Sequence, residues 1–207
     1  MTIVQSDDLR DLSRRLSEAR NQGKPYTLFL GSGCARAAGV PDWGEMAMRF
    51  FSEELATENS WVEDFMSFSE LSEIRRDPIR GRAKLIDSFV RMLLSLPIPI
   101  RYSVLQRFYD KIPVPEFYLQ LARMIKDGYF AHILTTSIDN LLENALAKVG
   151  VYRKDYDLIS LASAESRIQS FPESADKRFL IIKLHGDLAE QKVVIAPYEI
   201  EDTLHLH

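Results

Sequence analysis

The sequence has a single cysteine, no long apolar run and no excess of basic residues. Cys34 alone cannot build an internal disulfide or a structural zinc site with several cysteine ligands, and such sparse use of cysteine is typical of the reducing cytosol. The apolar stretch 93–100 is interrupted by two prolines and falls short of the roughly 18 residues of a membrane span. The first residues lack the pattern of a signal peptide. We therefore expect a cytoplasmic protein without a membrane segment or a metal site.

The charge balance argues against a further class of protein. The formal net charge is −4 at pH 7, whereas nonspecific nucleic-acid binding usually needs a concentrated basic face. We therefore expect no direct contact with nucleic acid. One local group of arginines is mixed with acidic residues and is interpreted as a solvated helix face or an interface. Its members are Arg75, Arg76, Arg80 and Arg82.

Hydrophobic periodicity predicts an α/β fold in a chain of 207 residues, a length that suits a single domain. Apolar runs rich in strand formers predict strands at 26–30, 129–134, 156–160, 179–184 and 193–196. Helical spacing predicts helices at 9–19, 44–55, 139–149 and 164–170. This alternation is typical of a Rossmann-like, mainly parallel sheet with helices on both faces.

The middle of the chain, residues 61–126, is helical in pattern and has no convincing strand. Two proline pairs interrupt it. We interpret it as a helical insertion after the first βα unit. The single domain 1–207 would then have a Rossmann-like core formed by 25–60 and 127–207.

Three polar clusters follow predicted strands, and ligands of open α/β sheets bind at the carboxyl ends of strands. In the first, Gly31-Ser32-Gly33, the glycines let the backbone approach a phosphate closely, although such turns also occur for structural reasons. In the second, Ser137 and Asp139 either line a site or cap the next helix. In the third, His185 lies before Gly186 on a tight turn, and it is either structural or placed to move a proton.

In this order, the three clusters resemble the SIR2 superfamily. Its pattern runs Gly-Ala-Gly-x-Ser-x-x-x-Gly-Ile-Pro-x-Phe, then Thr-x-Asn-x-Asp, then His-Gly. The positions that match are Gly31, Gly33, Gly39, Val40, Pro41, Trp43, Thr135, Asp139, His185 and Gly186. The neighbouring strings Leu141-Leu142-Glu143 and Lys183-Leu184 are more similar to prokaryotic SIR2-like proteins of antiphage defence than to deacetylases.

This resemblance implies cleavage of the nicotinamide–ribose bond of NAD⁺ to nicotinamide and ADP-ribose. It also implies that the domain is an effector in a homo-oligomer or a larger defence assembly. The residues that would bind NAD⁺ are Gly31, Ser32, Gly33, Arg36, Gly39, Pro41, Asp42, Trp43, Thr135 and Thr136. Arg36 would either pair with a phosphate or lie on the surface.

The catalytic positions implied by the resemblance are Asp139, His185 and residue 137. Asp139 would hold the carboxamide or the ribose, and His185 would contact the ribose hydroxyls or act as a base. Ser137 stands where the family has asparagine, and its single hydroxyl cannot both donate and accept as an amide does. The alternatives are an inactive domain that binds NAD⁺, ADP-ribose or a protein partner, a residue changed from asparagine, or a substitute role for Asn140. We favour the first two.

Two further features bear on function. Cys34 lies near a helix start, which could lower its pKa, or is a small packing residue. The chain ends before the Gly-x-Ser turn that binds adenosine in the family, so the adenosine side is either incomplete or supplied by a longer protein of which this is the N-terminal part. A protein deacylase is a weaker third interpretation, because the zinc cysteines are missing.

Overall fold

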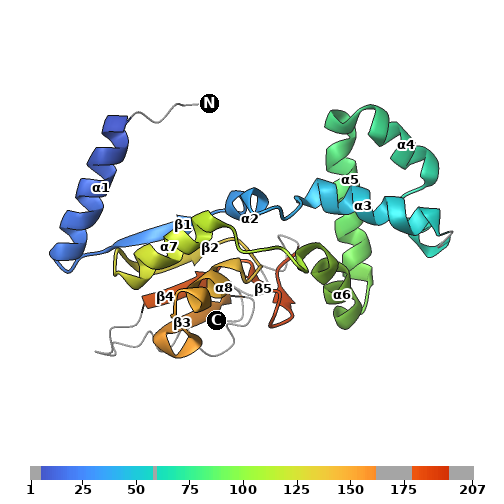
Figure 1. The fold of residues 1–207 in the computed structure, drawn as a ribbon. Helices are drawn as coiled ribbons and strands as arrows, with labels where there is room; N and C mark the ends of the chain where they lie inside the picture. Colours follow the sequence, from blue (N-terminus) through green and yellow to red (C-terminus); the bar gives the residue numbers. More distant parts are fainter. Residues whose placement is uncertain (1–5, 58–59, 162–178, 196–207) are drawn as a thin grey trace. The chain divides into compact units, whose positions relative to one another are not determined.

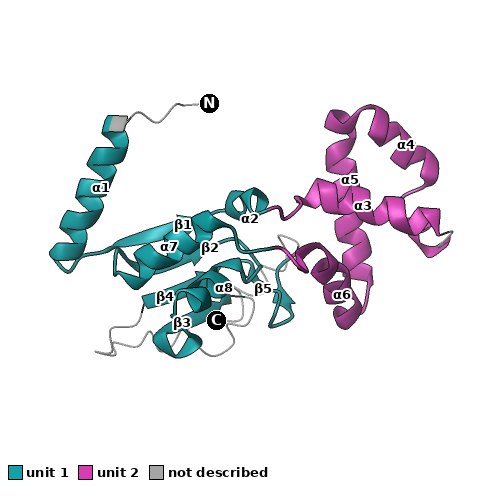
Figure 2. Cartoon of the chain, viewed as in Figure 1, with its two compact units in different colours: residues 1–38, 113–194, 200–207 teal, residues 39–112, 195–199 magenta. Residues whose placement is uncertain are grey.

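The computed structural model describes residues 6–57, 60–161 and 179–195. They form two compact units (Figure 2). The α/β unit comprises the described residues within 1–38 and 113–194, and the helical unit comprises those within 39–112. The two units are described separately.

The α/β unit is built on a four-stranded sheet of order β1-β2-β4-β3, in which all pairs are parallel (Figure 1). Its strands are β1 (Tyr26–Leu30), β2 (Phe130–Thr135), β3 (Tyr156–Ser160) and β4 (Phe179–Lys183). The structure thus confirms the predicted α/β class and the Rossmann-like parallel sheet. The apolar, β-branched composition of these short runs accounts for the prediction.

Helices of this unit are α1 (Ser6–Asn21), α2 (Gly33–Ala37), α7 (Glu116–Lys126) and α8 (Leu141–Lys148), with a 3₁₀ turn, η2 (Arg153–Asp155). Helix α7 packs against α8 and β2. Residues paired in a parallel sheet share a face. One face is buried at Leu30, Ile133 and Ile181, whereas the other leaves Phe29 60% exposed. The helix expected at 164–170 lies outside the described residues.

The strand predicted at 193–196 differs in the structure. Val193 belongs to β6 (Lys192–Val193), which pairs antiparallel with β5 (Gly186–Asp187) in a separate hairpin. Gly186 has a φ of 89° and Gln191 a φ of 54°. Both values are in the left-handed region, which turns the chain back on itself and prevents it from joining the parallel sheet.

The helical unit contains α3 (Trp43–Ala56), η1 (Ser60–Asp64), α4 (Phe68–Arg76), α5 (Pro78–Ser95) and α6 (Ile98–Tyr109). Its core centres on fully buried Phe51 and Phe89, whose rings meet edge to face at 6.2 Å. None of the helices in the described residues is long and apolar enough to cross a membrane.

The boundaries of the helical unit differ from those of the expected insertion. Helix α3 was expected in the first βα unit, but its apolar face packs on α5. Helix α7 was expected in the insertion, but its buried residues Tyr118, Ala122 and Ile125 belong to the α/β unit. The helical pattern shows that a helix has an apolar face, but not which partner covers it.

Candidate functional site

The four parallel strands end at the same edge of the sheet, at residues that pair with one another. Leu30 pairs with Thr135, Thr135 with Lys183, and Lys183 with Ser160. Neighbouring strands lie about 4.8 Å apart, so the loops after β1, β2 and β4 leave the same edge side by side. The structure therefore brings the first residues of all three motifs together at the carboxyl edge.

The glycines of the first motif stand beside open space. Neither Gly31 nor Gly33 has a positive φ, and a Cβ added to either would have no heavy atom within 4 Å. Backbone conformation and packing therefore do not require glycine here, and a ligand can approach the backbone closely. Gly39 differs, because its φ of 98° favours glycine by itself.

Two buried oxygens follow β2. Ser137 is 8% exposed and Asp139 6% exposed. The Leu141 N–H donates to Asp139 Oδ1 at 2.9 Å, so one carboxylate oxygen does take part in the start of α8, as the capping alternative predicted. Asp139 Oδ2 and Ser137 Oγ have no hydrogen-bond partner of good geometry within the described residues, but the Ser137 hydroxyl is close enough to Asp139 to oppose the rise in the pKa of that carboxyl group. Such buried groups are costly unless a ligand or water pairs with them.

A buried lysine connects the second and third motifs. Lys183 Nζ lies 2.6 Å from Glu143 Oε1 and 2.8 Å from Asp187 Oδ2, and it donates to the Asp139 carbonyl oxygen at 2.5 Å. Lys183 is 1% exposed. This cation therefore holds the β2–α8 loop, α8 and the turn after β4 in one arrangement.

The Lys183 cluster was not predicted as functional from the sequence. One feature of the sequence could have indicated this cluster: the apolar run Phe179–Lys183 ends in a lysine. A cation on a buried strand needs carboxylates close by. The sequence pattern alone does not indicate which carboxylates pair with Lys183. Glu143 becomes its partner through the parallel pairing of β2 and β4, and Asp187 through the turn that follows β4.

Burial and charge shift the protonation of this cluster. Burial raises the pKa of Asp139 above its ordinary value, and the Leu141 N–H and Lys183 offset that rise only in part. Burial lowers the pKa of Lys183, but Glu143 and Asp187 raise it by more, so the ammonium is retained. The site thus keeps a fixed cation beside a carboxyl group whose charge is disfavoured.

Tyr118 of α7 and Cys34 of α2 lie near Asp139. Burial raises the pKa of both groups, and the Asp139 charge adds to the rise. The expectation of a lowered Cys34 pKa is therefore wrong, because desolvation of the half-buried thiol dominates. The packing alternative fits Cys34 better. No motif signalled Tyr118, which is 2% exposed on the inner face of its helix.

His185 occupies the turn between β4 and β5. Its side chain is exposed and its carbonyl oxygen accepts the Val194 N–H at 2.9 Å. The Leu188 N–H donates to the Ile138 carbonyl oxygen at 2.9 Å, which ties the hairpin to the second motif. His185 therefore lies at the edge that carries Asp139, with its imidazole toward solvent.

Asn140 does not take the position of the missing asparagine. Its side chain is exposed and its Oδ1 accepts from Asn144 Nδ2 at 3.2 Å, along the surface of α8. Ser32 and Arg36 are also exposed, whereas Thr135 is buried and Thr136 half-buried. The Thr136 N–H donates to the Leu30 carbonyl oxygen at 3.1 Å, which extends the pairing of β1 and β2.

The remaining predicted NAD⁺ contacts lie in the helical unit. Asp42 caps α3, where its Oδ1 accepts the Glu45 N–H at 3.0 Å and pairs with Arg82 at 2.7 Å. The ring of Trp43 meets that of Phe89 edge to face at 6.1 Å. Gly39 and Pro41 precede α3. Within this unit, Asp42 and Trp43 thus have structural roles.

In the part of the chain that the structure describes, no group of three or more histidine, cysteine, aspartate or glutamate side chains could hold a metal ion. The terminal histidines lie outside that part. In a comparison with known families, residues 131–205 match the family described as "SIR2-like domain". No curated protein matches the chain. The match covers the second and third motifs, so this segment of the chain is similar to SIR2-like domains.

Proposed function

We propose that the chain is an NAD⁺ hydrolase that cleaves the nicotinamide–ribose bond. The observation that carries this proposal is the pair of buried, unpartnered oxygens at the carboxyl edge, Asp139 Oδ2 and Ser137 Oγ. They lie within the segment similar to SIR2-like domains. The open space beside Gly31 and Gly33 supports the proposal, because it leaves room for a pyrophosphate next to these oxygens.

The reaction is a hydrolysis. Water attacks C1′ of the ribose, the C1′–N bond breaks, and its electron pair neutralises the pyridinium nitrogen of nicotinamide. The transition state has positive charge at C1′, so an anionic oxygen placed nearby stabilises it more than the ground state. In this proposal Asp139 Oδ2 supplies that oxygen, since Lys183 and the positive charge of bound NAD⁺ both favour its ionised form. His185 accepts the water proton, and the loop from Gly31 to Gly33 holds the pyrophosphate.

Ser137 sets the expected rate. Serine is shorter than asparagine and offers one hydroxyl group, so it positions a ribose or a water less well. A misplacement of about 1 Å can lower a rate by roughly 10²-fold. We therefore expect the parent protein to turn NAD⁺ over slowly, and Ser137→Asn to be faster.

The alternative function is an inactive domain that binds NAD⁺ or ADP-ribose, or serves as a protein-interaction module. Two features favour it: Ser137 lacks the amide group of the motif asparagine, and the imidazole of His185 is exposed to solvent. The same buried oxygens and glycine loop would then bind nucleotide without cleaving it.

The wider role is also a proposal. By resemblance to antiphage SIR2-like proteins, we propose that the chain acts as an effector within a homo-oligomer or a larger defence assembly. Light scattering after size-exclusion chromatography tests self-association, with a mass above the 23.8 kDa of one chain as the expected result. A monomer at all concentrations would contradict the homo-oligomer.

Nicotinamide release from NAD⁺ tests the enzyme proposal. The parent should release nicotinamide, Ser137→Asn should release it faster, and His185→Ala should release almost none. His132→Ala is the matched control, because His132 is an exposed histidine of β2 away from the carboxyl edge. No release by the parent or by Ser137→Asn would reject the hydrolase and leave the binding module.

A further inference from the structure

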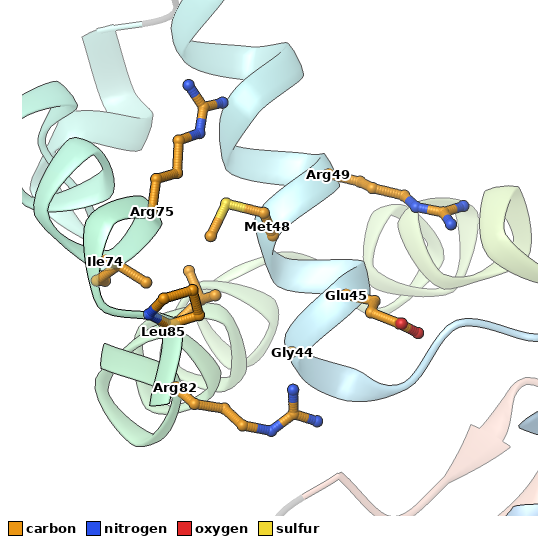
Figure 3. A pocket seen from close by; sticks show the side chains of 9 residues that line it. Gly44, Glu45, Met48, Arg49, Ile74, Arg75, Arg82 and Leu85 are labelled. Atoms are coloured by element: carbon orange, nitrogen blue, oxygen red, sulfur yellow. The ribbon is translucent and has the colours of Figure 1, made fainter. Parts of the chain in front are cut away.

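The helical unit has a hollow of about 380 Å³ that the proposed NAD⁺ site does not use. It lies among α3, α4 and α5, and Figure 3 shows the side chains around it. Apolar side chains from three helices form its floor, namely Met48, Ile74 and Leu85. Ile74 and Leu85 are 5% and 3% exposed, so the floor of the hollow is part of the core of the unit. A volume of this size is typical of a binding pocket.

Three arginines surround this apolar floor: Arg49, Arg75 and Arg82. Arg82 is neutralised by Asp42 at 2.7 Å, whereas among the residues that the structure describes Arg75 donates only to the Ser52 hydroxyl, at 2.6 Å. Within the described residues, Arg49 has no ion pair with a carboxylate.

Other cations of the same unit are mostly paired. The pairs are Arg80–Asp77, Lys84–Glu70, Arg91–Asp87 and Arg107–Glu54. The lining has one acidic residue, Glu45, which accepts the Asp42 N–H at 2.8 Å as part of the α3 cap. Positive charge without a counter-charge therefore remains beside the apolar floor, in a chain whose net charge is −4.

The arrangement of the arginines selects among anionic ligands. In Figure 3 the guanidinium groups of Arg49, Arg75 and Arg82 point in different directions and do not converge, and that of Arg49 points away from Ile74 and Leu85. A phosphate needs donors that converge on one point. Separate cations around an apolar floor instead suit an extended segment, with an apolar side chain in the hollow and carboxylates on either side.

We propose that this hollow binds an acidic segment of a partner protein. One aliphatic or aromatic side chain of the segment contacts Met48, Ile74 and Leu85. Its flanking Asp or Glu residues pair with Arg49 and Arg75. None of the residues involved is among those that the proposed hydrolysis uses, and all of them belong to the helical unit.

Selection of phage-displayed random 12-residue peptides on the intact chain tests the proposal, followed by calorimetry with the enriched peptide at 150 mM salt. Enriched peptides should carry an apolar residue flanked by Asp or Glu. Arg49→Glu should weaken binding by at least about tenfold. Met48→Lys should weaken it as well, although it adds positive charge, because it fills the apolar floor.

Arg76→Glu is the matched control. Arg76 is an exposed arginine of α4 that does not line the hollow, and the charge change equals that of Arg49→Glu. Because Arg76 does not line the hollow and salt weakens attraction between charges that are not in contact, the control should bind within about twofold of the parent. Each variant is first shown to keep the parent melting temperature.

Three results would overturn the proposal. The first is no enrichment of acidic peptides. The second is equal weakening by Arg49→Glu and Arg76→Glu, which would indicate nonspecific charge attraction. The third is displacement of the peptide by a 20-nucleotide single-stranded DNA with the same dependence on Arg49, which would indicate a nucleic-acid surface.

Discussion

At the scale of single residues, Lys183 combines complete burial with two carboxylate partners. A buried ion pair adds little stability compared with an apolar residue pair, but removing one member leaves the other charge without compensation. Lys183 also donates to the Asp139 carbonyl oxygen, so it fixes the loop that carries both unpartnered oxygens. The energetic cost of burying the Lys183 ammonium is therefore explained by its role in positioning the site.

Lys183→Met should lower the free energy of unfolding by about 3–5 kcal/mol, because Glu143 and Asp187 lose their cation. Urea unfolding measures this loss. Lys192→Met is the control, since Lys192 is an exposed lysine of β6, and it should change stability by less than about 0.5 kcal/mol. Equal effects of the two variants would contradict the structural role of Lys183.

The raised pKa of Lys183 also predicts a pH dependence. A folded-state pKa above the ordinary 10.5 means that the stabilisation is present below pH 10.5 and is lost as pH rises through the folded value. Lys183→Met should lack this alkaline loss. A parent and variant with the same alkaline profile would contradict the assignment.

Asp139→Asn should increase stability at neutral pH. The folded pKa of Asp139 is raised above 3.8, so its ionisation opposes folding as pH rises from the unfolded to the folded value. The amide oxygen can still accept the Leu141 N–H. The gain over the parent should grow between pH 4 and pH 8, by about 1.4 kcal/mol for each unit of the pKa shift.

The control for this variant is Asp127→Asn, at an exposed carboxylate beyond α7. In urea unfolding, the difference in the free energy of unfolding between this variant and the parent should not grow comparably with pH. A loss of stability in Asp139→Asn at pH 8 would show that the carboxylate is better solvated than its burial indicates.

Residue patterns predicted the polar positions of the carboxyl edge but not their surroundings. Ser137, Asp139 and His185 were found because each follows a recognisable strand. Lys183 and Tyr118 were missed, because their importance depends on contacts between segments far apart in the sequence. Such contacts follow from the strand order, which periodicity does not give.

At the scale of elements, the helix ends explain part of the second unit. Asp42 and Glu45 form a reciprocal capping box at the start of α3, and Ser67 and Glu70 form another at the start of α4. Asp42 additionally pairs with Arg82 of α5. The capping signal was present in the sequence as Asp42 followed by Glu45, three residues later.

Asp42→Ala should destabilise the helical unit by about 1–2 kcal/mol, because the first turn of α3 loses its acceptor and Arg82 loses its partner. Both tryptophans of the chain, Trp43 and Trp61, lie in this unit, so tryptophan fluorescence reports its unfolding.

Asp87→Ala is the control. It removes an exposed ion pair with Arg91 one helical turn away, which should cost only about 0.3–0.5 kcal/mol. If Asp42→Ala were no more destabilising than this, Asp42 would be available for a ligand instead of the cap.

Element type was predictable where the apolar pattern was strong, as at β1 and β3. The short hairpin of β5 and β6 was not, because two left-handed residues, Gly186 and Gln191, decide it. Only one of them is a glycine. The place of α3 and α7 was also missed, since each has a regular apolar face that several partners could cover.

At the scale of the whole molecule, the chain separates an α/β unit with the candidate nucleotide edge from a helical unit with an arginine-lined hollow. The match to SIR2-like domains covers 131–205, so it supports the second and third motifs. The glycine loop after β1 lies outside the match and rests on its own geometry. Its test is therefore the most direct test of the nucleotide site.

Calorimetric titration of ADP-ribose into the intact chain provides that test, and it does not depend on catalysis. Gly33→Val is the informative variant, because a Cβ added at this position has no heavy atom within 4 Å and the methyl groups of valine extend from it beside the loop. The account predicts saturable binding to the parent with a Kd below about 1 mM, and its loss in Gly33→Val at an unchanged melting temperature. No heat from the parent at millimolar ADP-ribose, or equal binding by Gly33→Val, would contradict a nucleotide site at the carboxyl edge.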